Sequence, residues 1–112
     1  MVLKKSEIRY EERSEIRGGK GKAKSFCYLK EGDMQNVKFV SLIELEPFSS
    51  VGEHPHTEDE EFYFVVEGSG RGFLNGKSFD ISEGDAFLCR RNDNHGIEAG
   101  KNGLKFLAVL VN

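Results

Sequence analysis

Hydrophobic and polar positions alternate in short runs through most of the chain after residue 36. The runs are rich in valine, isoleucine, leucine and phenylalanine, and turn residues such as glycine and asparagine separate them. A period of two is typical of β-strands that bury one face. The pattern predicts six or seven strands, over Val37–Leu45, Glu61–Val66, Arg71–Leu74, Lys77–Ile81, Ala86–Cys89, His95–Glu98 and Leu104–Val111. Such a series of short strands predicts an all-β sandwich or barrel.

Asn75-Gly76 gives the clearest turn signal, because it separates two alternating runs by two residues. A type I′ turn needs positive φ at both of its central positions, and asparagine followed by glycine adopts this conformation most readily. The pair therefore predicts a β-hairpin. The N-terminal part is less regular, and residues 4–17 carry only a weak pattern. We expect residues 1–30 to form an arm or extra strands and residues 31–112 to form the barrel domain.

The aromatic run Glu61–Val66 gives the two faces of one strand different character. Side chains alternate between the faces of a strand. The first face holds Glu61, Tyr63 and Val65, and the second holds Phe62, Phe64 and Val66. One face is expected to line the barrel interior, and the other to pack against a second sheet or a second subunit.

Composition places the chain among globular proteins of one domain. It has 112 residues, of which 38% are hydrophobic and 31% are charged, a balance that is typical neither of disordered nor of membrane proteins. No apolar run is long enough to cross a bilayer, and the first residues lack the apolar core of a secretory signal. Cys27 and Cys89 stand far apart, which favours two reduced thiols. We therefore expect a cytoplasmic protein without a membrane partner.

Charge is distributed unevenly, but it does not indicate a nucleic-acid partner. Residues 1–30 contain nine Lys/Arg and four Glu, whereas the whole chain has a net charge of −3. A nucleic-acid-binding domain is normally basic overall and carries a recognisable reading motif. The basic segment has neither feature, so a solvated face is the better interpretation.

The three histidines of the chain are the strongest chemical signal. His54 and His56 flank Pro55, so in an extended chain both imidazoles point to the same side. Glu61 opens an aromatic strand, where an unpaired inward carboxylate is costly unless a cation lies beside it. His95 follows much later, and a meandering barrel can bring it back beside His54. Imidazole and carboxylate donors suit a divalent ion such as Mn²⁺, Fe²⁺, Co²⁺, Ni²⁺, Cu²⁺ or Zn²⁺.

These spacings resemble the two motifs of the cupin superfamily. His54-Pro55-His56, then Glu61 after four residues and Gly68 after six more, is similar to the first motif, G-x5-H-x-H-x3,4-E-x6-G. Gly84 followed by His95 after ten residues is similar to the second, G-x5-P-x-G-x2-H-x3-N. The chain departs from the family pattern at four positions that are not ligands, namely Phe48, Arg90, Asn92 and Ala99.

The resemblance implies a small single-domain cupin, a jelly-roll barrel also described as a double-stranded β-helix. It implies one divalent metal ion held by His54, His56, Glu61 and His95, with about two coordination positions left for water or substrate. Glu60 is an alternative to Glu61, since the family allows either spacing. The resemblance further implies a homodimer, to which residues 1–30 can contribute.

Two functions from different classes follow. The first is a metal-dependent enzyme, a dioxygenase, an oxalate-type decarboxylase or an isomerase, acting on a small organic acid or sugar. The second is a cupin that binds or senses a small ligand or a metal without turnover. A barrel with no metal is a third, weaker hypothesis. An apolar pocket favours binding, whereas a pocket lined by arginine favours catalysis.

Several further residues can be interpreted either as functional or as structural. Tyr63 is a core aromatic or a proton carrier in the pocket. Arg90 and Arg91 are loop charges, or a fork that binds a substrate carboxylate, with Arg91 also a candidate catalytic residue. The acidic run Glu58-Asp59-Glu60 is interpreted as a solvated turn.

Overall fold

In the computed structural model, which describes residues 1–112, two short 3₁₀ helices and eight β-strands follow one another along the chain. The helices are η1 (Lys5–Glu7) and η2 (Ile16–Gly18). The strands are β1 (Tyr10–Ser14), β2 (Lys22–Lys30), β3 (Val37–Leu45), β4 (Ser50–Pro55), β5 (Glu60–Leu74), β6 (Lys77–Ser82), β7 (Ala86–Cys89) and β8 (Asn94–Val111). The all-β prediction is confirmed. Neither helix is long and apolar enough to cross a membrane.

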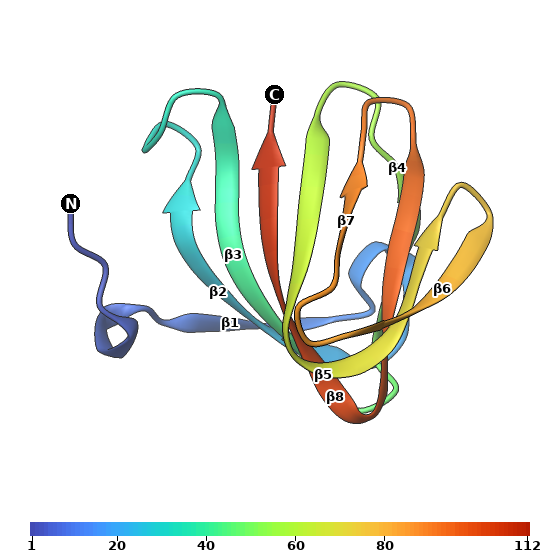
Figure 1. Cartoon of the computed structure of the whole chain (residues 1–112). Coiled ribbons are helices and arrows are strands. Elements are labelled where there is room, and N and C mark those ends of the chain that lie inside the picture. Colours follow the sequence, from blue (N-terminus) through green and yellow to red (C-terminus); the bar gives the residue numbers. More distant parts are fainter.

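All strand pairs are antiparallel, and the two long strands β5 and β8 run through both halves of the barrel (Figure 1). The first half of β5 and the second half of β8 lie together, flanked by β7 on one side and by β3 and β2 on the other. The second half of β5 and the first half of β8 also pair, flanked by β6 and β4. The two halves therefore face each other across a shared interior.

Each long strand replaces two strands that the sequence pattern predicts. The runs at 61–66 and 71–74 join into β5, and those at 95–98 and 104–111 join into β8. Register shifts in the β5–β8 pairing near Gly68 let both strands bend without ending. Gly68 has φ 89°, and a Cβ there would collide with the carbonyl of Gly103. Glycine thus marks a sharp bend here, where the two backbones touch, instead of the end of a strand.

The N-terminal segment adds strands to the sheet. β2 pairs with β3, and β1 pairs with β2 in turn. The sequence pattern does not identify β2, because polar residues interrupt its apolar positions. The boundary predicted at residue 30 coincides with the end of β2, and the division of the chain at that point stays a prediction.

The hairpin prediction at Asn75-Gly76 is confirmed. The two residues have φ 51° and 81° and join β5 to β6. The asparagine side chain also reaches the start of β8, where its Oδ1 accepts the Asn94 N–H at 2.9 Å.

The interior of the barrel contains the apolar core. Val65, Phe106 and Ile97 are fully buried, and ten further core residues are each at most 8% exposed. The alternation on β5 is as expected, because Tyr63 is 3% exposed while its neighbour Phe64 is 39% exposed. Both cysteines are free, Cys27 at the surface and Cys89 inside.

Candidate metal centre

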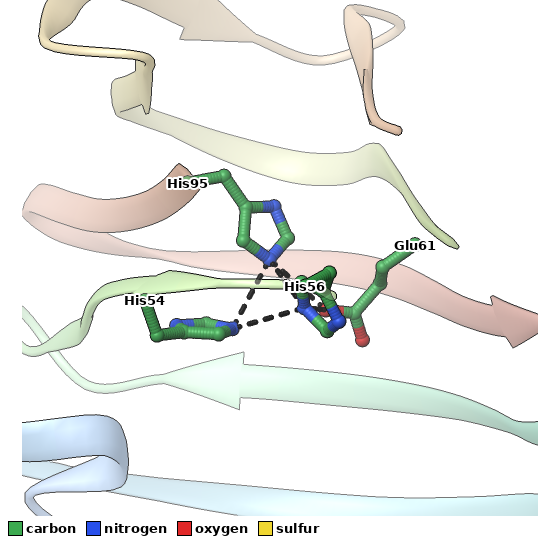
Figure 2. A group of neighbouring side chains, drawn as sticks. All are labelled: His54, His56, Glu61 and His95. Atoms are coloured by element: carbon green, nitrogen blue, oxygen red, sulfur yellow. Dashed lines mark hydrogen bonds and ion pairs between the residues drawn. The ribbon is translucent and has the colours of Figure 1, made fainter. Parts of the chain in front are cut away.

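Three separate strand ends bring the predicted ligands to one point. His54 is the penultimate residue of β4, and His56 is the first residue after that strand. Glu61 is the second residue of β5, and His95 is the second residue of β8. His54 is paired directly opposite His95 in the β4–β8 ladder, so their side chains leave the sheet on the same face. All four side chains point toward one another inside the barrel (Figure 2).

Five of the six distances between the four donor atoms are 3.1 or 3.2 Å. The Nε2 atoms of His54 and His56 are 3.2 Å apart, those of His56 and His95 are 3.1 Å apart, and those of His95 and His54 are 3.2 Å apart. Glu61 Oε1 lies 3.2 Å from the His56 Nε2 and 3.1 Å from the His95 Nε2. All four side chains are buried, between 0% and 7% exposed. The four residues form a group that offers one ligand atom each, all within 4.8 Å of one another.

Outer contacts set the direction of two imidazoles. The His54 Nδ1–H donates to the Gly52 carbonyl at 2.7 Å, and the His56 Nδ1–H donates to Asp59 Oδ1 at 2.6 Å. Because Nδ1 carries the proton in both neutral rings, each Nε2 presents a lone pair. His95 differs, since its buried Nδ1 has no hydrogen-bond partner.

Lone pairs facing one another at this distance suit a shared cation. Imidazole nitrogens bind transition metals at about 2.0–2.1 Å, so two nitrogens at right angles about one ion lie about 3 Å apart. The observed separations of 3.1–3.2 Å match that spacing. The donor set therefore fits one divalent ion with four protein ligands.

The ionisation of His54 and Glu61 agrees with this fit, whereas contact with the Glu61 carboxylate raises the pKa of His56. Burial lowers the pKa of His54 to about 4, which keeps its ring neutral at pH 7 and able to bind a metal. Burial acts to raise the pKa of Glu61, but the imidazoles of His56 and His95 beside it outweigh burial and lower that pKa to about 2. Glu61 is therefore a carboxylate and supplies one negative charge.

The loop before β8 holds the backbone of His56 through two hydrogen bonds. The His56 N–H donates to the Asp93 carbonyl at 3.0 Å, and the Asn92 N–H donates to the His56 carbonyl. Asp93 also shapes the loop, since its carboxylate accepts the Arg90 N–H at 2.9 Å and the Asn75 amide at 2.9 Å. Asn92 has φ 75°, a conformation that asparagine tolerates better than most residues. This explains how the loop keeps its shape without the glycine of the motif.

The other predicted residues lie at different distances from the cluster. Tyr63 stacks on His95, with ring centroids 4.6 Å apart, and burial raises the pKa of its hydroxyl well above the ordinary value. Arg90 and Arg91 are exposed, and neither forms a hydrogen bond or ion pair with the four residues. The Arg91 guanidinium lies 3.4 Å from the Glu58 carbonyl. The roles assigned to these three residues stay predictions.

Asp59 corrects the interpretation of the acidic run as a solvated turn. Its side chain is 15% exposed and contacts both His56 and Lys38. The position three residues after His56 was the only signal in the sequence, and many exposed carboxylates share such spacing. Glu58 is exposed as expected, and Glu61, not Glu60, belongs to the buried group.

The barrel and its buried cluster of histidine and glutamate define a small cupin-type protein. The family model described as the Cupin domain matches residues 41–110, and the chain belongs to this family. The prediction of a cupin fold is therefore confirmed.

A curated sequence and a solved structure, both from Thermotoga maritima, resemble the whole chain. One is named an oxalate-binding protein and is 37% identical, over 99% of this chain and 93% of its own length. The other is a crystal structure described as a predicted oxalate decarboxylase, 36% identical, with a TM-score of 0.95 over 99% of this chain and 98% of its own. The structure of KdgF from a Halomonas species, 16% identical with a TM-score of 0.78, covers 100% of this chain and 94% of its own length and shares the fold.

Proposed function

We propose that the chain binds one divalent transition-metal ion through His54, His56, Glu61 and His95, and that this ion binds a small organic acid such as oxalate. The observation that carries the proposal is the convergence of three Nε2 atoms and one carboxylate oxygen on one buried point. Mn²⁺, Fe²⁺, Co²⁺, Ni²⁺, Cu²⁺ and Zn²⁺ all accept this donor set.

The class of small molecule follows from the coordination positions that the protein leaves open on the ion. Four protein donors leave about two positions of an octahedral ion open. A dicarboxylate fills two neighbouring positions with one oxygen from each carboxylate. The name of the relative that is 37% identical, an oxalate-binding protein, supports the same class of ligand.

The surroundings of the cluster favour binding over turnover. The rings of Tyr63 and Phe87 lie 4.6 Å and 6.2 Å from that of His95, and Phe106 packs behind Tyr63. Neither Arg90 nor Arg91 forms a hydrogen bond or ion pair with the four residues, although the charge of Arg17 acts on both His54 and Tyr63. Cys89 is buried beside Glu61 in the sheet, and burial raises the pKa of its thiol to about 12. Decarboxylation requires a proton donor close to the reacting carbon. The raised pKa values of Tyr63 and Cys89 make both groups poor proton donors.

A metal-dependent enzyme is the second candidate, as a dioxygenase, an oxalate-type decarboxylase or an isomerase. One contact favours it, because Tyr63 carries a hydroxyl within the buried wall of the site, beside His95. In that case Tyr63 delivers a proton to the substrate. Arg90 or Arg91 then contributes only if its loop moves toward the ion.

Calorimetric titration of oxalate into the protein tests the proposal. We expect one oxalate to bind per chain after loading with Mn²⁺ or Co²⁺, and none to bind after chelation. The same samples are assayed for formate and carbon dioxide. Binding without products supports the binding function, and product formation selects the enzyme. Equal oxalate binding with and without metal would contradict the proposal.

We also propose that two copies associate through the outer face of β2, β3, β8, β5 and β7. Phe62, Phe64, Val66 and Leu88 on this face are each 38–41% exposed. By strand register, Leu107 and Val109 and then Val40 and Leu42 continue the face toward β2. Two charged pairs lie near this face, Lys105–Glu67 and Lys38–Asp59. Two such faces attract through apolar contact, and a twofold dimer buries the same patch on both copies.

Phe64→Glu is expected to shift the protein from dimer to monomer, because it places a charge at the centre of the apolar face. Light scattering coupled to size exclusion measures the mass. Phe48→Glu is the control, since Phe48 is 65% exposed in the turn before β4. A wild-type protein that is monomeric at high concentration would rule the interface out.

A cytoplasmic location is proposed on the state of the thiols. Cys27 is exposed and free, and the reducing cytoplasm preserves such a thiol.

A further inference from the structure

Lys38, Asp59 and His56 form a chain of contacts that ends at the metal centre. The Lys38 ammonium lies 3.0 Å from Asp59 Oδ2, and Asp59 Oδ1 lies 2.6 Å from the His56 Nδ1. Lys38 comes from β3, Asp59 from the turn before β5, and His56 from the segment after β4. Strand β3 and the connection between β4 and β5 therefore meet behind one imidazole.

The three imidazoles are held in three different ways. The His54 Nδ1–H donates to a neutral backbone carbonyl, and the His95 Nδ1 has no partner at all. Only His56 donates to a charged group. A hydrogen bond to a carboxylate is shorter and stronger than one to a neutral acceptor, and it increases the electron density that the opposite nitrogen offers to a cation.

We propose that Asp59 is a positioning residue for the metal centre, holding His56 with Nε2 directed at the ion, and that Lys38 holds Asp59 in place. The inference rests on the proposed metal site and adds to it a residue outside the ligand set. Partners of this kind fix the tautomer and orientation of a ligand, and their loss typically weakens metal binding about 10–100-fold.

The test compares Co²⁺ binding by the purified full-length chain and its variants. Asp59→Asn keeps the size and one acceptor oxygen but removes the charge, and about 10-fold weaker Co²⁺ binding is expected. Asp59→Leu also removes the acceptor, and the loss should approach about 100-fold. Glu58→Gln is the matched control, because Glu58 is an exposed carboxylate in the same turn, and its Co²⁺ affinity should equal that of the wild type.

A second readout separates positioning from general stability. Nitrogen-15 spectra of the metal-free protein at alkaline pH, where imidazoles are neutral, report which nitrogen carries the proton. The wild type should show His56 protonated at Nδ1 alone, and Asp59→Leu should show both tautomers. A change in melting temperature without a change in tautomer or affinity would indicate a structural role and overturn the inference.

Lys38 provides an internal check by a double-mutant cycle. Lys38→Met should weaken Co²⁺ binding less than Asp59→Asn does, and it should add nothing in the Asp59→Asn background, because both changes act through one contact. Additive effects would contradict the chain of contacts.

The outcomes distinguish this inference from the function on which it rests. If the wild type binds no Co²⁺, the metal site itself is refuted. If the wild type binds one ion and Asp59→Asn binds it equally well, the metal site stands and the role of Asp59 is refuted. Asp59→Asn is nearly isosteric, so this comparison remains decisive even if Asp59→Leu fails to fold.

Discussion

His95→Ala is expected to abolish stoichiometric binding of a divalent ion. The His95 side chain is fully buried, and its Nε2 lies 3.1–3.2 Å from donor atoms of the other three residues. Alanine therefore removes a donor that lies close to all three others and leaves a gap in its place. Metal analysis after dialysis should give about one ion per wild-type chain and none per variant chain.

The same variant should lose its stabilisation by metal. A ligand that binds only the folded state stabilises it by about 2.7 kcal/mol when present at about 100 times its dissociation constant. Melting curves with and without metal should therefore differ for the wild type and coincide for His95→Ala. Glu60→Gln is the control, because Glu60 precedes Glu61 but lies outside the buried group, and it should behave as the wild type does. If the His95→Ala variant still binds one ion per chain, His95 is not a ligand of that ion.

Phe106→Ala is expected to destabilise the protein by about 3–5 kcal/mol, the cost typical of truncating a fully buried phenylalanine. Phe106 is 0% exposed, and its ring centroid lies 4.7 Å from that of Tyr63, which in turn stacks on His95. The cavity would therefore open directly behind the metal centre. Denaturant unfolding of the metal-free protein measures the change.

Phe48→Ala provides the control for this comparison. Phe48 is 65% exposed, and surface substitutions usually change stability by less than about 0.5 kcal/mol. A loss for Phe106→Ala no larger than that for Phe48→Ala would show that the barrel interior is not packed as described.

The sequence predicts those features that depend on local pattern. Val37–Leu45 has the same bounds in the pattern and in the structure, because nine residues of a core strand carry a strong signal. The turn at Asn75-Gly76 is equally local, since its φ values depend on two residues. The convergence of His54, His56, Glu61 and His95 was predicted from motif spacing. This spacing reflects the register of β4, β5 and β8.

Features that depend on contacts distant in sequence were missed. The joining of two runs into β5 requires pairing with β8 on both sides of Gly68, which no local window contains. Asp59 resembles its exposed neighbour Glu58 in sequence, and only the approach of Lys38 from β3 distinguishes them. The course of the loop that holds Arg90 and Arg91 likewise depends on Asp93 and Asn75, which meet between the β7–β8 connection and the β5–β6 hairpin.

The account depends most on a single metal ion bound inside the barrel, and anomalous X-ray diffraction tests this directly. Crystals grown with Co²⁺ would be measured on both sides of its absorption edge. The account predicts one strong peak per chain, about 2.0–2.2 Å from the Nε2 atoms of His54, His56 and His95 and from a carboxylate oxygen of Glu61. A map with no peak at this position, or with the ion held by other residues, would contradict it.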